Sequence, residues 1–315
     1  MTWPSSISIM PSPRVSIGLP VYNGEQYLPA ALDSILSQDY NDFELIISDN
    51  ASTDSTQDIC RRYAARDSRI RYYGKEANIG ASGNFNCLVE LARGEFFKWA
   101  AHDDVHLPGF LRRCVEIIEQ APAKVILVAP KAEVIDEHGK TLYKLAESLD
   151  TRHPQPHQRV GDVLRGILWA TAQFGLFRRD ALRKTRLIQP FFASDYVLLV
   201  EVALMGEIWE LPETLFQRRK HPGISTTANA SSRDLLAWFD TSQKGFINYI
   251  PPRLRLGFEF FRAIARSQLP FRERLLCYLT VFKAWSPREY RLYKTKIALR
   301  TRLKKLVNGV AGESL

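Results

Sequence analysis

Residues 95–108 read Glu-Phe-Phe-Lys-Trp-Ala-Ala-His-Asp-Asp-Val-His-Leu-Pro, and this stretch decides the fold. Its first half is apolar on both faces of an extended segment, which is typical of a central strand covered by helices on each side. Asp103 and Asp104 follow directly. Two adjacent carboxylates are costly to bury unless a cation or a set of amides takes up their charge. Because open α/β sheets bind ligands at the carboxyl ends of their strands, one interpretation is a divalent cation that bridges the protein and a phosphate.

A simpler interpretation gives the two acids no ligand. Asp104 would cap the helix predicted over residues 108–120, and Asp103 would face water. The stretch by itself leaves both interpretations open.

Strands and helices alternate on either side of this stretch. Apolar segments predict strands over 15–23, 43–48, 69–73, 124–135 and 208–216, and helical periodicity falls over 25–38, 54–66, 85–93 and 196–205. This alternation predicts an α/β fold with a mostly parallel sheet flanked by helices, wound by right-handed crossovers. The polar segments that follow the strands should therefore gather at one edge. Pro20 is expected to break the first strand, since proline cannot donate to a central ladder.

The size of the chain, 315 residues with 45% hydrophobic composition, predicts one large domain with an appendage. We divide it into a loose lead-in over 1–13, a main domain over 14–230 and a basic helical region over 231–315. The four cysteines show no C-x-x-C spacing, which favours reduced, buried thiols over disulfides or zinc. Reduced thiols indicate a reducing compartment, so a cytoplasmic protein is expected. No signal peptide is recognised in residues 1–13.

The net charge of +9 is concentrated near the C-terminus. After residue 250 there are 15 Lys and Arg against 4 Asp and Glu, so the body is close to neutral. This distribution disfavours a nucleic-acid groove. Residues 286–309 begin with a capping box and keep leucines on one side of a basic helix. That helix either lies on an anionic membrane surface or packs on the main domain with its charges solvated.

His102 and His106 have the H-x-x-x-H spacing of a zinc site on a helix. The preceding strand and the following Pro108 make a helix across both residues improbable, and no glutamate stands between them. The spacing therefore does not predict zinc.

Six short motifs occur in a characteristic order along residues 14–225. They are Pro20-Val21-Tyr22-Asn23, Asp49-Asn50-Ala51-Ser52-Thr53-Asp54, Asn78-Ile79-Gly80, His102-Asp103-Asp104, Ser194-Asp195 and Arg219-Lys220-His221. The ordered set resembles the family 2 glycosyltransferases, which have the GT-A fold. The C-terminal region lies outside the resemblance.

The resemblance implies a nucleotide-sugar site. Pro20, Tyr22 and Glu25 would line its nucleotide end, and Asp49 would hydrogen-bond the base, uracil being the commonest in the family. Asn78 and Gly80 would lie near the ribose or diphosphate, although Gly80 also suits an ordinary turn in the loop predicted over 78–84.

The resemblance also implies a metal site. Asp103 would be the metal ligand of a D-x-D-type motif, with Asp104 and His221 as further candidates. Ala101 stands where the family often has the first acid, so His102 would help to hold the ribose. Mg²⁺ or Mn²⁺ would neutralise the departing diphosphate.

Asp195 occupies the place of the family's catalytic acid. As a general base it would deprotonate the acceptor hydroxyl, giving inversion in a single displacement. Its alternative role is that of a first-turn acid favoured by the helix dipole. Residues 142–160, with Pro154 and Pro156, are expected to form a mobile loop near the acceptor.

The predicted function is metal-dependent, inverting transfer of a sugar from a nucleotide-diphosphate donor to a glycan, lipid-linked glycan or other hydroxyl acceptor. A UDP-sugar is the favoured donor. Such an enzyme would serve polysaccharide biosynthesis for the cell envelope. It would be located in the cytoplasm or on the inner membrane face. A sugar nucleotidyltransferase is one alternative, but residues 19–26 lack the Arg or Lys that such a loop would carry. A catalytically idle relative that binds a membrane or partner is the other.

Overall fold

The structure is a computed structural model that describes residues 12–223 and 252–284. Most of the predicted lead-in and the basic helix predicted over 286–309 lie outside the described residues.

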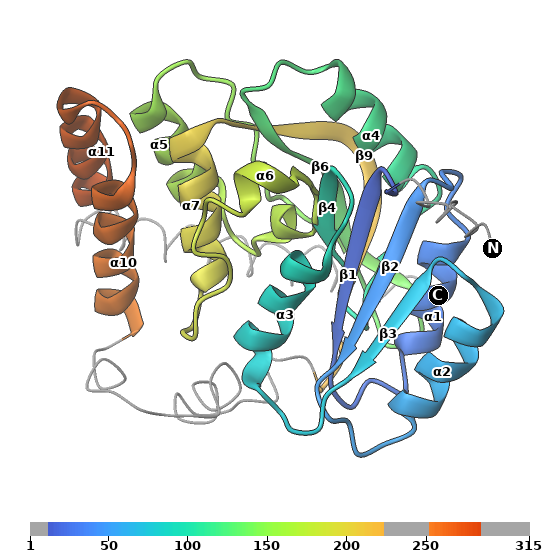
Figure 1. Ribbon diagram of the computed structural model, residues 1–315. Coiled ribbons are helices and arrows are strands. Elements are labelled where there is room, and N and C mark those ends of the chain that lie inside the picture. Colours follow the sequence, from blue (N-terminus) through green and yellow to red (C-terminus); the bar gives the residue numbers. More distant parts are fainter. Residues whose placement is uncertain (1–11, 224–251, 285–315) are drawn as a thin grey trace, which may run out of the picture.

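The described strands form one mixed sheet (Figure 1). They are β1 (Val15–Val21), β2 (Phe43–Asp49), β3 (Ile70–Gly74), β4 (Phe96–Trp99), β5 (Val105–His106), β6 (Val125–Ile135), β7 (Thr141–Lys144), β8 (Leu176–Arg178) and β9 (Glu207–Arg219). Their order is β3-β2-β1-β4-β8-β6-β9-β5, with β7 beside β6. The first four strands are parallel, and β8 is antiparallel to both β4 and β6.

Helices cover both faces of this sheet (Figure 1). They are α1 (Leu28–Leu36), α2 (Thr56–Arg66), α3 (Gly80–Leu91), α4 (Phe110–Gln120), α5 (Pro156–Gly166), α6 (Arg179–Leu182), α7 (Ser194–Met205), α10 (Pro252–Arg266), α11 (Phe271–Ala284) and the 3₁₀ turn η1 (Thr171–Phe174). One apolar core contains residues of α1, α2 and α4, and the other contains residues of α3, α5, α7, α10 and α11. The predicted α/β architecture is confirmed.

Strand β4 confirms the prediction made for its sequence. Phe96 belongs to one core, while Phe97 and Trp99 belong to the other, and all three are fully buried. Lys98 is also buried, and burial lowers its pKa to about 7. Its Nζ lies 2.7 Å from Nε2 of His106, so this amine is held inside the protein.

The expectation that Pro20 breaks the first strand is wrong. β1 continues to Val21, and Pro20 pairs in register with Ser48 of β2. On the side of β2, Val21 O accepts a hydrogen bond from Asn50 N, whereas on the side of β4, Gly18 O accepts one from Ala100 N. Since successive residues alternate between the two ladders, the missing N–H of Pro20 falls on the β4 side, where pairing has just ended.

Beyond Gly18, β1 and β4 are no longer paired and a gap opens between them. At this point of the sheet the chain order of the strands reverses. From β1 the chain proceeds outward through β2 and β3, then returns to β4 on the other side of β1. In open α/β sheets this switch point, at the carboxyl ends of the strands, is where ligands bind.

Two predicted loops are partly regular. The loop expected over 142–160 contains most of β7 and the start of α5, and Thr151 within it is fully buried. Thr151 N donates to Ile208 O at 2.8 Å, and its hydroxyl accepts from Ile208 N, so the segment is fixed to β9. The loop expected over 78–84 ends early, because α3 begins at Gly80.

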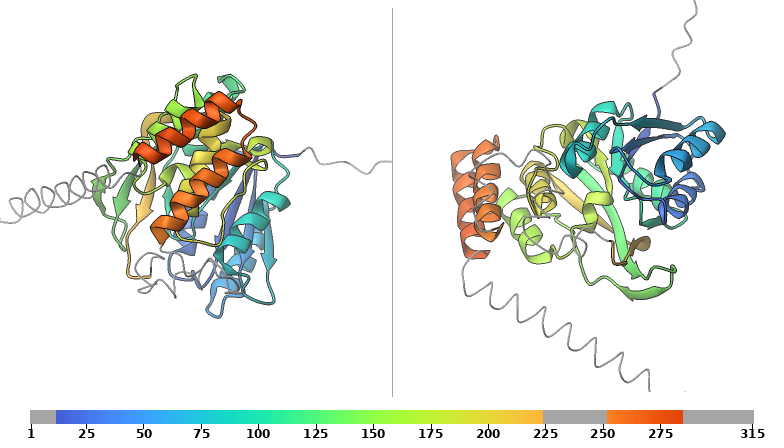
Figure 2. Two further views of the ribbon diagram at one scale, coloured as in Figure 1. Left: turned by 90° about the vertical axis from the view of Figure 1, so that its left-hand side faces the viewer. Right: turned by 90° about the horizontal axis from the view of Figure 1, so that it is seen from below.

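Helices α10 and α11 form an outer layer on the main domain (Figure 2). α10 packs on α7 and α11 packs on α5, and Phe260, Ile264 and Val281 are buried in the same core as α7. Over residues 252–284 the basic C-terminal region is therefore packed against the main domain. No helix within the described residues is long and apolar enough to cross a membrane.

Candidate active site

A cleft of about 1000 Å³ lies at the carboxyl ends of β1 and β4. It brings together most of the residues that the sequence singled out. They are Pro20, Tyr22, Asn78, His102, Asp103, Asp104, Asp195 and His221. Glu25, Asp49 and Gly80 are not among the lining residues.

Asp103 and His221 form the polar centre of this cleft. The Nε2 of His221 lies 2.9 Å from Oδ2 of Asp103, and the two side chains are 9% and 16% exposed. Burial opposes ionisation of Asp103, but the hydrogen bond from His221 and the nearby His102 outweigh it, and the pKa of Asp103 is lowered. Asp103 therefore presents a negative charge to the cleft.

Asp104 has a different environment. Its Oδ1 accepts the backbone N–H of Arg219 at 2.9 Å, and the residue is 4% exposed. Burial and the neighbouring Asp103 raise the pKa of Asp104 well above its usual value. Helix α4 starts after Gly109 without a side-chain cap, so the interpretation of Asp104 as its cap is wrong.

Asp103 and His221 are the residues at this point of the cleft that could hold a divalent cation, through a carboxylate oxygen and an imidazole nitrogen. In octahedral coordination with metal–ligand distances of about 2.1 Å, two neighbouring ligands are about 3 Å apart. The Asp103–His221 separation of 2.9 Å is that of a hydrogen bond, and a cation could bind both atoms only in place of the proton between them. Among the described residues no group of three or more His, Cys, Asp or Glu side chains is placed to enclose a metal. The protein would thus supply few ligands and leave the others to phosphate and water, the usual arrangement for Mg²⁺.

The two histidines of the H-x-x-x-H spacing are separated by the fold. His102 lines the cleft, whereas His106 is buried against Phe110 and Phe216 beside Lys98.

Amide side chains form the end of the cleft nearest β2. The Nδ2 of Asn50 donates to Oδ1 of Asn78 at 2.9 Å, and Oδ1 of Asn50 accepts from Ile79 N. Asn84 on α3 donates to Ser48 O, while its buried Oδ1 has no partner within the described part of the chain. Asn50 belongs to the motif over residues 49–54 but was not predicted as a site residue, and Asn84 lay at the end of a segment interpreted as a loop.

The three predicted residues outside the lining have structural partners. Asp49 is 2% exposed, with Oδ1 accepting from Ser52 N and Oδ2 accepting from the Tyr72 hydroxyl at 3.0 Å. Glu25 is exposed and accepts the Ser55 N–H. Gly80 opens α3 with φ of 78°, a conformation that favours glycine. Their roles in binding stay predictions.

Asp195 enters the cleft from the first turn of α7. Ala193, the N-cap residue of α7, has φ of 63°, which turns the chain sharply into the helix. Burial raises the pKa of Asp195 to about 6, in spite of the hydrogen bond that its Oδ1 accepts from Tyr196 N. A carboxylate that titrates this close to neutrality is suited to proton transfer.

A loop held by Glu147 forms the wall beside Asp195. The Glu147 carboxylate accepts the backbone N–H groups of Leu168, Trp169, Ala170 and Thr171, and also the Thr171 hydroxyl. This fixes Trp169, which lines the cleft, is 44% exposed and lies under the Arg218 guanidinium at 4.8 Å. This wall was not predicted, because its residues follow no periodic pattern in the sequence.

The fold and the site define an α/β protein with an acidic ligand cleft at the switch point of its sheet. The sequence model of the family described as Glycosyl transferase family 2 matches residues 16–186, more than half of the chain. The chain therefore belongs to glycosyltransferase family 2, and the resemblance inferred from its motifs is confirmed.

Relatives in several bacteria are named as glycosyltransferases. An uncharacterized glycosyltransferase of Rickettsia prowazekii is 36% identical over 132 residues, which are 42% of this chain and 40% of that relative. An uncharacterized glycosyltransferase of Nostoc sp. is 29% identical over 226 residues, covering 70% of this chain and 68% of the relative. The chain thus spans about two fifths of the rickettsial protein.

Solved structures share the fold. The TarS protein of S. aureus, residues 1–349 in complex with UDP, has a TM-score of 0.55 at 17% identity, with 89% of this chain and 91% of that chain covered. The predicted GT-A fold is confirmed.

Proposed function

We propose that the chain catalyses inverting transfer of a sugar from a nucleoside diphosphate donor to a hydroxyl acceptor. The observation that carries the proposal is that Asp103 and Asp195, from different elements, line one cleft with opposite shifts in pKa. One acid stays charged to face a cation and diphosphate, while the other can accept a proton near neutral pH.

The donor would bind at the β1–β4 end of the cleft. Asp103 and His221 would hold Mg²⁺ or Mn²⁺, with Asp104 as a further candidate, and the bound cation would neutralise the leaving diphosphate. Tyr22, Asn78 and His102 would contact the nucleotide. Asp49 is 2% exposed and does not line the cleft, so it could reach a base only after a local rearrangement.

The nucleotide is proposed to be uridine diphosphate. This choice rests on the family resemblance, in which uracil is the commonest base. TarS was solved with UDP and with UDP-GlcNAc, although at 17% identity its likeness to this chain concerns the fold alone.

The acceptor would bind beside Asp195. Its hydroxyl would give a proton to the Asp195 carboxylate while its oxygen attacks the anomeric carbon, and the bond from that carbon to the diphosphate would break. Attack from the side opposite the leaving group inverts the configuration. The exposed Trp169 ring would pack against an acceptor sugar, so a glycan, free or lipid-linked, is the acceptor class that we favour.

Domain limits and location are also proposals. We propose a main domain over 14–230 and a basic helical region over 231–315, whose helices α10 and α11 share the core of the main domain. A cytoplasmic enzyme, or one held on the inner membrane face, would have access to nucleotide sugars.

The direct test measures release of nucleoside diphosphate from a panel of nucleotide sugars, with Mn²⁺, with Mg²⁺ and with EDTA. Metal-dependent release from a UDP-sugar supports the proposal. Pyrophosphate formation from UTP and a sugar phosphate would instead show the nucleotidyltransferase alternative. Tight nucleotide binding without turnover of any donor would indicate the catalytically idle alternative.

A further inference from the structure

Helices α10 and α11 carry an unusual number of exposed apolar side chains. Six of the twelve large hydrophobic residues that are exposed in the described chain lie on these two helices. They are Leu254 (62%), Phe258 (61%), Phe271 (73%), Leu275 (47%), Leu279 (46%) and Phe282 (69%). We call these six residues the outer face.

The outer face is a regular feature of both helices. On α11 its members recur at spacings of four, four and three residues, which places them on one side of the helix. The opposite side of α11 buries Cys277 and Val281 in the core. Between the helices, the half-buried rings of Phe261 and Tyr278 stack with their centroids 5.5 Å apart, so α10 and α11 pack against each other.

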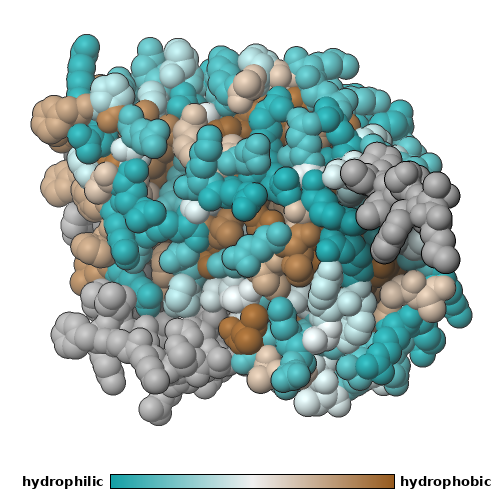
Figure 3. Space-filling model, viewed as in Figure 1, coloured by the Kyte–Doolittle hydropathy of each residue, from teal (hydrophilic) through white to brown (hydrophobic). Residues whose placement is uncertain are grey.

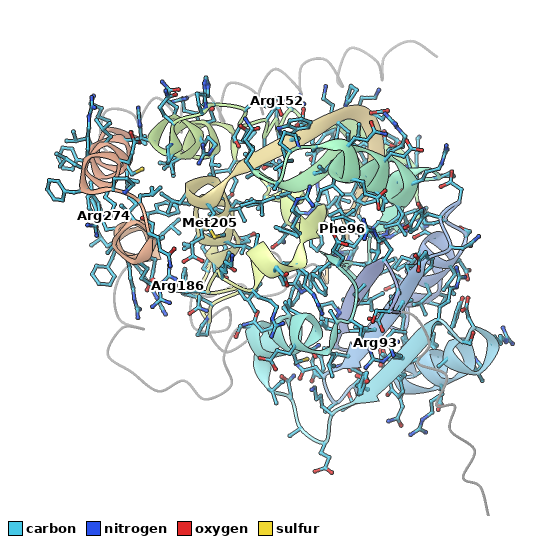
Figure 4. The ribbon with its side chains drawn as sticks, turned by 45° about the horizontal axis from the view of Figure 1, so that its top comes forward. Arg93, Phe96, Arg152, Arg186, Met205 and Arg274 are labelled. Carbon is cyan, nitrogen blue, oxygen red and sulfur yellow. The ribbon has the colours of Figure 1, made fainter. Side chains whose placement is uncertain are left out.

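The figures show where this surface lies. In Figure 2 the two helices form the layer farthest from the sheet, and in Figure 3 tan and brown side chains gather along the left edge, where α10 and α11 lie. Figure 4 shows side chains of both helices projecting away from the domain, on the side beyond Arg186.

The charges around the outer face have one sign. Residues 252–284 contain seven Lys and Arg against two Glu. Both acids are engaged inward, because Glu259 accepts from Arg186 and Glu273 lies 3.1 Å from Nδ1 of His157. Four of the cations are exposed to solvent. They are Arg262, Arg266, Arg272 and Lys283.

We propose that the outer face docks on an anionic lipid surface, with its Phe and Leu side chains inserted among the headgroups and its Arg and Lys side chains on lipid phosphates. Exposed apolar side chains rimmed by cations are what such a surface recognises. A second copy of the chain fits less well, since a two-fold contact would bring cationic rims together. This surface differs from the helix predicted over 286–309, and it does not depend on the proposed catalytic function.

The test is flotation of the full chain with vesicles of phosphatidylcholine alone and of phosphatidylcholine with 30% phosphatidylglycerol. We expect binding to the anionic vesicles that weakens with added salt. The triple variant Phe258→Ser/Phe271→Ser/Phe282→Ser should bind at least tenfold more weakly, and Arg266→Gln/Arg272→Gln/Lys283→Gln should lose the preference for anionic lipid. Matched controls are Leu142→Ser, which removes a 43% exposed apolar residue elsewhere, and Arg61→Gln/Arg62→Gln on α2.

All these positions are exposed, so circular dichroism should show that each variant folds. Three results would overturn the proposal. The first is equal binding by the wild-type chain and the triple Ser variant, which would assign the lipid contact to another part of the chain. The second is equal binding to neutral and anionic vesicles. The third is no lipid binding together with a dimer that the Ser variant dissociates, which would make the outer face a contact between copies.

Discussion

Asp103 and His221 lie 118 residues apart in the chain, yet Oδ2 of one is 2.9 Å from Nε2 of the other. Arg219 fixes this approach, because its backbone N–H bonds to Asp104 and its Nε bonds to Asp103 O. The loop after β4 and the end of β9 are thereby joined at the cleft. This relationship underlies the proposed metal site.

His221→Ala should weaken the binding of Mn²⁺ at the proposed metal site. The substitution removes the hydrogen bond that favours ionised Asp103 and also removes one candidate ligand. We expect the Mn²⁺ concentration for half-maximal turnover to rise about tenfold or more. A metal titration of activity measures it, with His138→Ala as control because that side chain is 83% exposed. An unchanged Mn²⁺ requirement would remove His221 from the site.

Glu147→Gln should weaken binding of the acceptor. An amide group cannot accept hydrogen bonds through both terminal atoms, so some of the N–H groups of residues 168–171 lose their partner and the Trp169 loop loosens. The unsatisfied groups should lower the free energy of unfolding by about 1–3 kcal/mol. KM for the acceptor should rise while the Kd for nucleotide stays the same. Glu90→Gln, on the exposed side of α3, is the control, and a rise in nucleotide Kd instead would contradict the assignment.

The raised pKa of Asp195 predicts how kcat/KM falls at acidic pH. Its pKa is raised to about 6, so the carboxylate is the ionised base above that pH and becomes protonated below it. The value of kcat/KM should therefore fall about tenfold per pH unit below pH 6. Stopped assays between pH 5 and 8, with stability checked at each pH, measure this. A flat profile down to pH 5 would exclude Asp195 as the base.

Arg186→Ala should destabilise the protein and loosen α10. Arg186 donates to Glu201 of α7 and to Glu259 of α10, and all three side chains are largely buried. Because two buried carboxylates lose this cation, the free energy of unfolding measured in urea should fall by about 3–5 kcal/mol. Arg186→Met/Glu201→Gln/Glu259→Gln, which removes every charge, should recover much of that loss.

The exposed pair Arg112–Asp39 is the control for this measurement. Breaking it with Arg112→Ala should cost less than about 1 kcal/mol. Equal effects of Arg186→Ala and Arg112→Ala would show that the buried cluster does not hold α10 to the domain.

The part of the fold that could be predicted is the part fixed by local pattern. Phe96, Phe97 and Trp99 made β4 recognisable because burial on both faces leaves an unbroken apolar run. The acids after it, together with Asp195, could be placed in one site because the motifs occur in a known order.

The rest depends on contacts between distant segments. Pro20 stays in β1 because the neighbouring strand has already ended, which no local rule reveals. Residues 142–160 are fixed by the hydrogen bond of Thr151 to Ile208 of β9 and by those of Glu147 to the Trp169 loop, contacts that their prolines do not reveal. Asp49 has the position expected of a base-binding residue, but Tyr72 and Ser52 occupy its oxygens.

The most direct test of the central claim is to compare nucleotide binding and sugar transfer in the same Asp195→Asn protein. Calorimetry with UDP and Mn²⁺ should give a Kd close to that of the wild type, while turnover with the UDP-sugar identified in the panel should fall about 10²–10⁴-fold. Asp103→Asn should lose metal-dependent UDP binding. Near-normal turnover in Asp195→Asn, or unchanged Mn²⁺-dependent binding in Asp103→Asn, would contradict the division of roles between the two acids.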